Sequence, residues 1–380
     1  MKNIKISAII GLTVLILTSV TACGKKNQVS ETVSETIEES SEVNDEEIDG
    51  DAALEDDAVE DELGDTIDGD VQPANTELEE NVEEDIEPEP EVPKRVDLIM
   101  FMGQSNMSGC GGDASLAPHV SEEAGMEFRA ISNPTQLYQI VEPFGINENN
   151  INGLMEKPGG KKGSLVSSFV NEYYKETGVQ VVAVSASLGE TDMDKWLSEN
   201  IMLDVMTRYI TARTWLVDNG FEIGHKYVVW LQGESDALKR ISSDEYKTKM
   251  DDFIRPLFMD GIEKVFFITP GRTIDETEIY SKIIRAQLEM SKNSGYYGLA
   301  TSVLSGVSCE YMTDIYHYNQ HVLNLVGEEA AKSVAYYTNT GHERVIYDYK
   351  NKEMFVPDGC EDYFADALEP IDLTNINERY

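Results

Sequence analysis

The sequence VDLIMFMGQSNMSG at residues 96–109 contains the clearest structural signal in the chain. Its first seven residues are almost all apolar, which is typical of a strand buried on both faces of a parallel sheet. The small and polar residues that follow predict a tight turn into a helix. A serine in such a turn, here Ser105, can expose its hydroxyl, and the backbone N–H groups beside it can receive a negatively charged oxygen.

Similar apolar runs alternate with helical periods through the sequence from residue 95 onward. This alternation predicts a three-layer α/β/α fold in which helices cover both faces of a central parallel sheet. Functional residues should then lie beyond the carboxyl ends of the strands. Strands are expected at 96–102, 180–185, 227–232, 264–269 and 297–303. Helices are expected at 165–177, 201–219, 244–258, 276–291 and 318–337.

The N-terminal part of the chain has a different composition. The 380-residue chain has 71 Asp and Glu against 30 Lys and Arg, a net charge of −41, and 28 of the acidic residues fall within residues 27–93. A segment this charged and this poor in apolar residues cannot bury enough surface to offset the entropy of ordering. Residues 23–94 are therefore expected to be a disordered acidic linker. Residues 95–380 are expected to be one domain, with a C-terminal extension from about residue 341.

Residues 1–22 have the features of a bacterial lipoprotein signal peptide. Lys2 and Lys5 precede an apolar run at 6–17 that is too short for a comfortable membrane span. The last residues before and including Cys23 resemble a lipobox, in which the cysteine is acylated and becomes the mature N-terminus. The chain is therefore expected to be extracytoplasmic and lipid-anchored to the outer face of the cell membrane. A simple N-terminal helix anchor is the alternative.

Two further polar segments lie where a functional site is expected. The strand at 227–232 is followed by a run with an amide and two carboxylates, Gln232, Glu234 and Asp236, although helix capping is an alternative role for this run. Nearer the C-terminus, Asp314 lies three residues before His317. An Asp at this spacing can orient the imidazole so that its other nitrogen faces a nucleophile. Capping by Asp314 and a surface role for His317 are the alternatives.

Neither a metal nor another cofactor is expected. His321 lies one helical turn after His317, but no carboxylate or third ligand follows at a suitable spacing. The cysteines of the domain, Cys110, Cys309 and Cys360, are odd in number. Their connectivity cannot be read from the sequence, so buried unpaired thiols are expected, with one disulfide and a free thiol as the alternative.

Four segments together resemble the conserved blocks of SGNH hydrolases, in the branch of sialate O-acetylesterases and acetylxylan esterases. The resemblance extends over residues 97–334 and implies a flavodoxin-like SGNH hydrolase fold. In the second block, Leu188 and Glu190 depart from the usual Gly-Gly-Thr/Ser pattern, whereas Gly189 and the following Trp196 are present. The four segments are GQSNM at 103–107, SLGETDMDKW at 187–196, WLQGESDA at 230–237 and DIYH at 314–317.

The resemblance implies a catalytic role for several of these residues. Ser105 would be the nucleophile, and His317 would be the general base and then the general acid. An imidazole is needed because a serine hydroxyl is a poor nucleophile at neutral pH. Both Asp314 and Glu234 are candidates for the acid that orients His317, with Asp314 favoured by its spacing.

The resemblance also implies which groups would contact the substrate. The backbone N–H groups of Ser105 and Gly189, together with the side-chain amide of Gln232, would face the oxyanion. Tyr311 is a further aromatic candidate for the sugar site, with core packing as the alternative for it and for Trp196. The expected substrate-binding residues are Gln104, Asn106 and Trp196.

The sequence thus predicts an extracytoplasmic carbohydrate O-acetylesterase that acts on acetylxylan-like or sialic acid glycans through a Ser-His-Asp/Glu acyl-enzyme. A non-catalytic glycan-binding lipoprotein and an esterase for lipid or simple esters are the alternatives. We expect a monomer whose only membrane contact is the lipid anchor. Nucleic acid is excluded as a partner because polyanion binding needs cations. Residues 94–380 keep a net charge of −17, which favours neutral polysaccharide over sialic acid.

Overall fold

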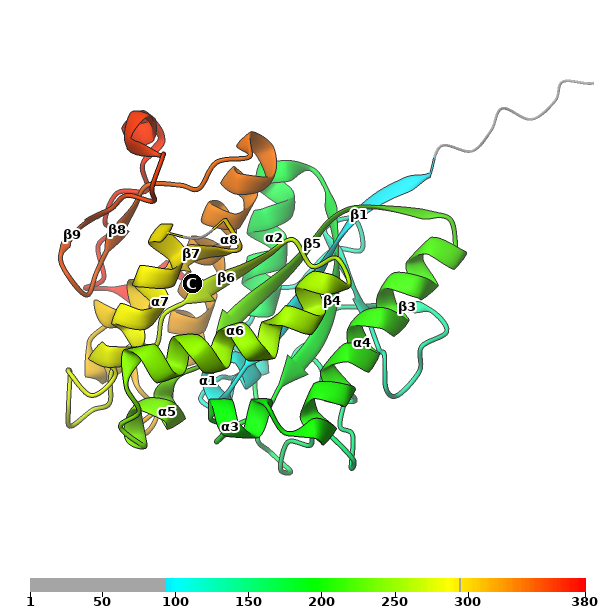
Figure 1. Cartoon of the computed structure of the whole chain (residues 1–380), viewed down its shortest axis with the longest axis horizontal. Coiled ribbons are helices and arrows are strands. Elements are labelled where there is room, and N and C mark those ends of the chain that lie inside the picture. Colours follow the sequence, from blue (N-terminus) through cyan, green and yellow to red (C-terminus); the bar gives the residue numbers. More distant parts are fainter. Residues whose placement is uncertain (1–92, 294) are drawn as a thin grey trace, which may run out of the picture. The chain divides into compact units, whose positions relative to one another are not determined.

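The computed structural model describes residues 93–293 and 295–380 (Figure 1). The predicted signal peptide at 1–22, the lipidated Cys23 and nearly all of the acidic linker at 23–94 lie outside the described residues. Within the described part, no helix combines the length and the hydrophobicity that crossing a membrane requires.

The domain is built on a seven-stranded sheet. Its strands are β1 (Lys94–Gly103), β2 (Gly125–Phe128), β3 (Leu137–Gln139), β4 (Gln180–Ser187), β5 (Phe221–Leu231), β6 (Lys264–Ile268) and β7 (Tyr297–Thr301). The strand order is β3-β2-β4-β1-β5-β6-β7, and every neighbouring pair is parallel except β2 with β3. The five predicted strands are therefore confirmed, and β1 lies at the centre. The short edge strands β2 and β3 were not predicted, because three or four residues are too few to show a period.

Helices cover both faces of this sheet, as the alternating pattern predicts (Figure 1). They are α1 (Ser105–Ser108), α2 (Val166–Thr177), α3 (Met193–Trp196), α4 (Glu199–Asp218), α5 (Glu234–Leu238), α6 (Ser243–Met259), α7 (Ser281–Asn293), α8 (Gln320–Thr340) and α9 (Ile376–Arg379). Helices α2 and α8 pack on one face around Phe169 and Val326, and α4, α6 and α7 pack on the other around Phe253 and Ile284. The predicted three-layer α/β/α fold is correct.

Helix boundaries follow ordinary capping chemistry. The side chain of Asn319 accepts a hydrogen bond from the N–H of Val322 at 3.1 Å and begins α8. Gly341, with φ of 74°, ends this helix in the left-handed conformation that glycine adopts without steric cost. Helix α7 begins at Ser281, later than the predicted residue 276, because the preceding residues form turns in which Thr273 Oγ1 accepts from the N–H of Glu276 at 3.0 Å.

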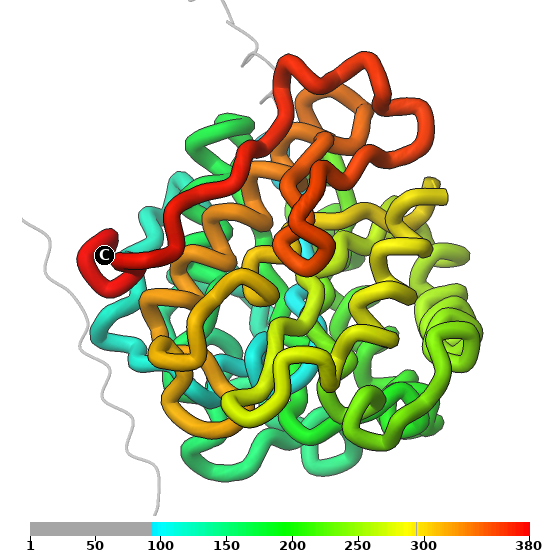
Figure 2. Tube along the Cα trace, turned by 90° about the vertical axis from the view of Figure 1, so that its left-hand side faces the viewer, coloured from blue at the N-terminus to red at the C-terminus, as the bar shows by residue number. Residues whose placement is uncertain are grey.

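The C-terminal extension follows α8 and lies on the surface of the domain, as Figure 2 shows. It contains a small hairpin of β8 (Ile346–Asp348) and β9 (Glu353–Phe355). Further on, Ile376 is 2% exposed and packs into the core on the α8 side of the sheet. Ile346 of β8 is also 2% exposed and packs into the core, so buried apolar contacts attach the extension to the domain near both of its ends.

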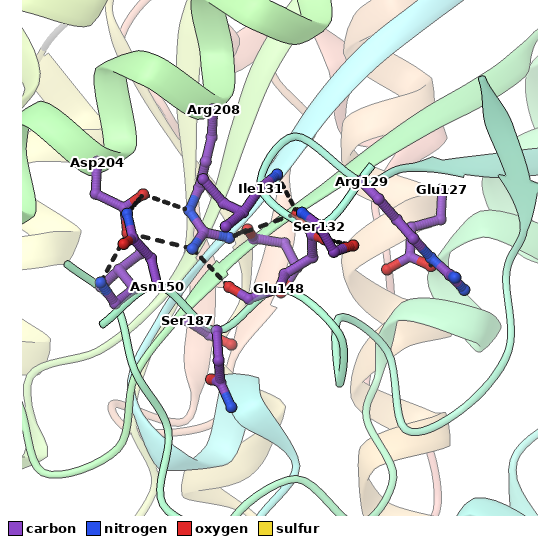
Figure 3. Close-up of polar contacts among 12 residues, drawn as sticks. Glu127, Arg129, Ile131, Ser132, Glu148, Asn150, Ser187, Asp204 and Arg208 are labelled. Atoms are coloured by element: carbon purple, nitrogen blue, oxygen red, sulfur yellow. Dashed lines mark hydrogen bonds and ion pairs between the residues drawn. The ribbon is translucent and has the colours of Figure 1, made fainter. Parts of the chain in front are cut away.

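A buried ion cluster fastens the loops near β3 to helix α4 and strand β4 (Figure 3). Arg208 of α4 donates to the carbonyl oxygens of Ser185 and Glu148, each at 2.7 Å, and to the carboxylate of Asp204 at 3.2 Å. The side chains of Arg208 and Asp204 are each only 1% exposed. A buried charge of this kind is tolerated because several hydrogen bonds compensate its lost hydration.

The carboxylates of this cluster in turn hold the backbone of the loops. Glu148 accepts from the N–H of Ile131 at 2.9 Å and of Ser132 at 3.2 Å. Asp204 accepts from the N–H of Leu154 at 2.7 Å. The cluster therefore fixes a long irregular segment that reaches the carboxyl edge of the sheet.

Candidate active site

Ser105 lies at the carboxyl end of the central strand β1. The strand ends at Gly103, where an added Cβ would lie 2.0 Å from the carbonyl oxygen of Leu231, so no other residue fits. The N–H of Gln104 then donates to that oxygen at 2.9 Å and turns the chain into α1. Ser105 is the first residue of α1 and is 6% exposed. Its position therefore follows from a close approach between β1 and β5.

His317 lies on the loop before α8 and is bonded to Asp314. Asp314 Oδ2 lies 2.7 Å from His317 Nδ1, and Asp314 Oδ1 accepts from the N–H groups of Tyr316 at 2.8 Å and His317 at 3.0 Å. Burial alone would raise the pKa of Asp314, but the hydrogen bonds from His317 and from the backbone outweigh it and lower the pKa. This geometry leaves His317 Nε2 as the nitrogen available for chemistry.

Glu234, the other candidate for orienting His317, is placed differently. It is 3% exposed, and its Oε1 accepts from Asn106 Nδ2 at 3.0 Å. Its Oε2 is buried without a hydrogen-bond partner among the described residues. Burial raises the pKa of this carboxyl, and the bond from Asn106 opposes the rise. Glu234 therefore supports the turn that carries Ser105, whereas Asp314 contacts the imidazole.

Asn106 and Gln104, predicted to contact substrate, also tie the loops of the site together. Asn106 Nδ2 donates to the carbonyl of Tyr316 at 3.2 Å, and its Oδ1 accepts from the N–H of Tyr318 at 3.3 Å. Gln104 Oε1 accepts from the N–H of Ser235 at 3.2 Å. The nucleophile turn is therefore linked both to the histidine loop and to the start of α5.

Ser105 and His317 line one cavity of about 230 Å³ at this edge of the sheet. Among the described residues, no hydrogen bond joins Ser105 Oγ to His317 Nε2; such contacts commonly tighten when substrate binds. The exposed lining residues of the cavity include Tyr316 of the histidine loop, at 41%, and Leu238 at the end of α5, at 45%. The remaining lining residues are Gln104, Asn106, Glu190, Glu234, Ser235, Leu238 and Tyr316.

The expected role of Gln232 in the oxyanion site is wrong. Gln232 is fully buried, and its Nε2 donates to the carbonyl of Thr191 at 3.0 Å and to the carboxylate of Asp236. These acceptors leave its amide no donor for the cavity. Gln232 instead connects the end of β5 to the segment before α3.

The two backbone N–H groups expected in the oxyanion site differ in whether another group of the protein accepts their hydrogen bond. The N–H of Gly189 donates to Glu156 Oε2 at 2.7 Å, so a carboxylate occupies the position expected for an oxyanion. The N–H of Ser105 has no acceptor among the described residues. Glu190, which stands at the Thr/Ser position of the family pattern, has φ of 61° and forms an ion pair with Lys157 at 2.6 Å. The residue that departs from the family pattern, Glu190, thus contacts the same loop, through Lys157, that Gly189 contacts through Glu156.

The expectation that Trp196 contacts the sugar is also wrong. Trp196 is 0% exposed and packs edge-on against Trp230 and Phe253, while its Nε1 donates to Thr191 Oγ1 at 3.1 Å. Tyr311 is likewise buried, and core packing accounts for both residues. The exposed aromatic residue of the cavity is Tyr316. It lies between Asp314 and His317, and its position next to the histidine is the signal in the sequence that points to it.

The cysteines do not add a second nucleophile. Cys110, Cys309 and Cys360 are all unpaired in the described chain, as expected, but only Cys110 and Cys360 are buried and Cys309 is half-buried. Burial raises the pKa of the Cys110 thiol to about 12, which keeps it protonated at neutral pH. No group of three potential metal ligands occurs among residues 93–293 and 295–380.

A serine, a histidine and an aspartate at the carboxyl edge of a parallel sheet define this site as that of an α/β serine hydrolase. The comparison with protein families gives the particular group. Residues 95–336 match the carbohydrate esterases described as sialic acid-specific acetylesterases. The chain therefore belongs to this family of esterases, which act on acetyl esters.

Solved structures with similar folds include three proteins that each align with 63% of this chain. A protein from Arabidopsis thaliana is 20% identical, with a TM-score of 0.44 and 97% of its own length covered. A carbohydrate acetylesterase from Xanthomonas citri is 16% identical, with a TM-score of 0.40 and 57% covered. A lipase/acylhydrolase from Enterococcus faecalis is 12% identical, with a TM-score of 0.32 and 95% covered. A search of curated proteins found no match.

Proposed function

We propose that this esterase removes O-acetyl groups from a polysaccharide through an acyl-enzyme formed on Ser105. The observation that carries the proposal is the cavity shared by Ser105 and His317, with His317 Nδ1 held by Asp314 at 2.7 Å. A nucleophile beside a base that is itself oriented by an acid is the arrangement required for acyl transfer.

The chemistry follows from these positions. His317 Nε2 accepts the hydroxyl proton as Ser105 Oγ attacks the acetyl carbonyl carbon, and Asp314 stabilises the resulting imidazolium. The N–H of Ser105 donates to the oxyanion. His317 then passes its proton to the departing sugar oxygen, leaving acetyl-Ser105. Water attacks this ester by the same proton transfers, which releases acetate and restores the free hydroxyl.

The proposed location is outside the cytoplasm, with the enzyme anchored through diacylated Cys23. It is supported by the sequence of residues 1–23, in which a short apolar run ends in a lipobox-like segment. More than one acyl chain gives a stable anchor, whereas one chain is marginal. The acidic linker would then separate the esterase domain from the membrane, where extracellular glycans are accessible.

The direct test is acetate release from a panel of acetylated polysaccharides by the wild type and by Ser105→Ala. We expect Ser105→Ala to lose all measurable release. Ser108→Ala is the matched control, because Ser108 lies in the same turn, is 2% exposed and has an Oγ without a partner among the described residues. Unchanged acetate release by Ser105→Ala would refute the proposal, and glycan binding by a wild type that releases no acetate would favour the non-catalytic alternative.

A further inference from the structure

The active-site cavity continues into a longer groove. Leu238 of α5 lines both the catalytic cavity and a second cavity of about 410 Å³. Glu278 and Lys282 line that second cavity and also a third, of about 360 Å³, which reaches Lys350 in the turn of the β8–β9 hairpin. Shared lining residues make the three cavities neighbours along one side of the domain. Figure 1 shows α5, α7 and the hairpin in succession along its left-hand side.

The groove beyond Leu238 has a charge opposite to that of the domain. We call it the basic groove, and its ionisable lining residues are Arg240, Lys282, Arg285, Lys350, Glu276 and Glu278. Four of these are basic and two are acidic, although residues 94–380 as a whole have a net charge of −17. Local charge in a cleft, rather than net charge, determines which ligand is attracted there.

Two of the basic side chains in this groove are not neutralised by the protein. Arg240 and Lys282 are both exposed, and their side chains have no hydrogen-bond or ion-pair partner among the described residues. By contrast, Glu278 is paired with Lys350 at 2.8 Å and accepts from Ser281 Oγ at 2.7 Å, and these bonds lower its pKa. Glu276 lines the same cavity as Arg240 and Lys282, and its exposed carboxylate also has no partner among the described residues. The unpaired groups of the cavity next to the catalytic one therefore carry one net positive charge.

The same cavity also offers apolar surface. Ile241 and Ile279 are half-buried lining residues, and Leu238 is exposed at the junction with the catalytic cavity. A sugar ring has both C–H faces and polar groups, so a site with apolar side chains beside a guanidinium and an ammonium suits a carboxylated sugar. A guanidinium binds a carboxylate in a bidentate manner, which adds orientation to attraction.

We propose that the basic groove is a subsite for an acidic polysaccharide, in which Arg240 and Lys282 bind the carboxylate of a uronic acid residue near the acetylated sugar. The inference rests on the proposed esterase function and names its substrate class. It replaces the expectation, drawn from net charge, that neutral polysaccharide is preferred. An enzyme of this kind discriminates between glycans at a distance from the reacting ester.

The experiment uses the full chain and two synthetic acetylated oligosaccharides that differ only in one residue, a uronic acid or the matching neutral hexose. The wild type should show a kcat/KM about tenfold higher for the acidic substrate, as expected for one or two charge-assisted contacts. This ratio should fall in 0.5 M NaCl, because salt screens exposed charges. In Arg240→Gln/Lys282→Gln the ratio should fall to about one.

Lys292→Gln is the matched control, because Lys292 is an exposed lysine at the far end of α7, which also carries Lys282. It should retain the wild-type ratio. The ratio does not depend on the amount of folded enzyme, so partial misfolding of a variant does not obscure the result, and the single variants provide a second measurement. A wild-type ratio of one, or an unchanged ratio in the double variant, would overturn the subsite. Absence of acetate release from both oligosaccharides would refute the esterase proposal instead.

Discussion

Two groups, each of which joins a carboxylate to a basic side chain, differ in burial. In the Arg208 cluster, the side chains of Arg208 and Asp204 are each 1% exposed. In the histidine loop, the side chain of Asp314 is 53% exposed and that of His317 is 20% exposed. In both groups the carboxylate accepts hydrogen bonds from a basic side chain and from the backbone, so the main difference between them is burial. A buried charge must stay paired and so fixes geometry, whereas an accessible one can change protonation during a reaction.

The largest expected effect comes from the accessible pair. Asp314→Asn should lower kcat about 10³- to 10⁴-fold, because the imidazole loses the acceptor that orients it and stabilises its charged form. The thermal midpoint should stay close to that of the wild type. The measurement is kcat on a chromogenic acetyl ester.

Glu234→Gln is the matched comparison for this variant. Its amide oxygen can still accept from Asn106, so we expect a much smaller loss of kcat. If Glu234→Gln instead lost activity while Asp314→Asn kept it, the assignment of the orienting acid would have to be reversed.

Breaking the buried cluster should affect stability before activity. Arg208→Met leaves Asp204 and Glu148 buried without their cation, which should lower the free energy of unfolding by about 3–5 kcal/mol. Urea unfolding followed by circular dichroism measures this change. Arg213→Met on the same helix is the control, because Arg213 is 34% exposed and pairs with Asp260 at 3.2 Å; it should cost about 1 kcal/mol or less. Equal losses in both variants would contradict the distinction by burial.

Buried and accessible carboxylates should also differ in how their contribution to the free energy of unfolding depends on pH. Burial raises the pKa of Asp236 from 3.8 to about 6, despite hydrogen bonds from Gln232 and the N–H of Met193. Its folded pKa exceeds its unfolded one, so its contribution to stability is present below about pH 4 and is lost as pH rises to about 6. The loss amounts to roughly 3 kcal/mol. The pKa of Asp314 is lowered, so its contribution has the opposite sign and is lost as pH falls.

Urea unfolding of the wild type and Asp236→Asn at pH 4 and pH 7 isolates the contribution of Asp236. The free energy of unfolding of the wild type minus that of Asp236→Asn should be larger at pH 4 than at pH 7. The same difference at both values would show that Asp236 does not titrate in this range.

The smallest effect is expected at the surface. Lys157→Ala removes the ion pair with Glu190, whose side chains are 64% and 80% exposed respectively. Water screens such a pair, so the thermal midpoint should not change measurably. A clear drop in the midpoint would mean that this contact, together with the bond from Gly189 to Glu156, holds the loop over the site.

Much of the fold was predictable because its strands are long apolar runs. Residues 96–102 and 227–232 were recognisable as buried strands, and both form the centre of the sheet. Strands β2 and β3 were missed because they contain only four and three residues. The antiparallel edge of the sheet was therefore missed as well.

The candidate site also contains residues that the local sequence could predict and residues whose role it could not. Ser105, Asp314 and His317 were predictable because each depends on local sequence, either a turn after a strand or a spacing of three residues. Gln232, Gly189 and Trp196 belong to recognisable blocks, but their hydrogen bonds or packing involve residues that are distant in sequence. A sequence pattern places a donor on the chain and does not show which acceptor it meets.

What the sequence determined by itself is the five long strands, the helices between them and the candidate reacting groups Ser105, Asp314 and His317, because these follow from hydrophobic periodicity and short spacings. Only the tertiary structure decided that Asp314 rather than Glu234 contacts His317 and that the Gly189 N–H meets Glu156. It also decided that basic residues from the segment after α5, from α7 and from the turn between β8 and β9 line one groove. The physical reason is that burial and charge at a site depend on packing between distant segments, which net charge and local pattern do not contain.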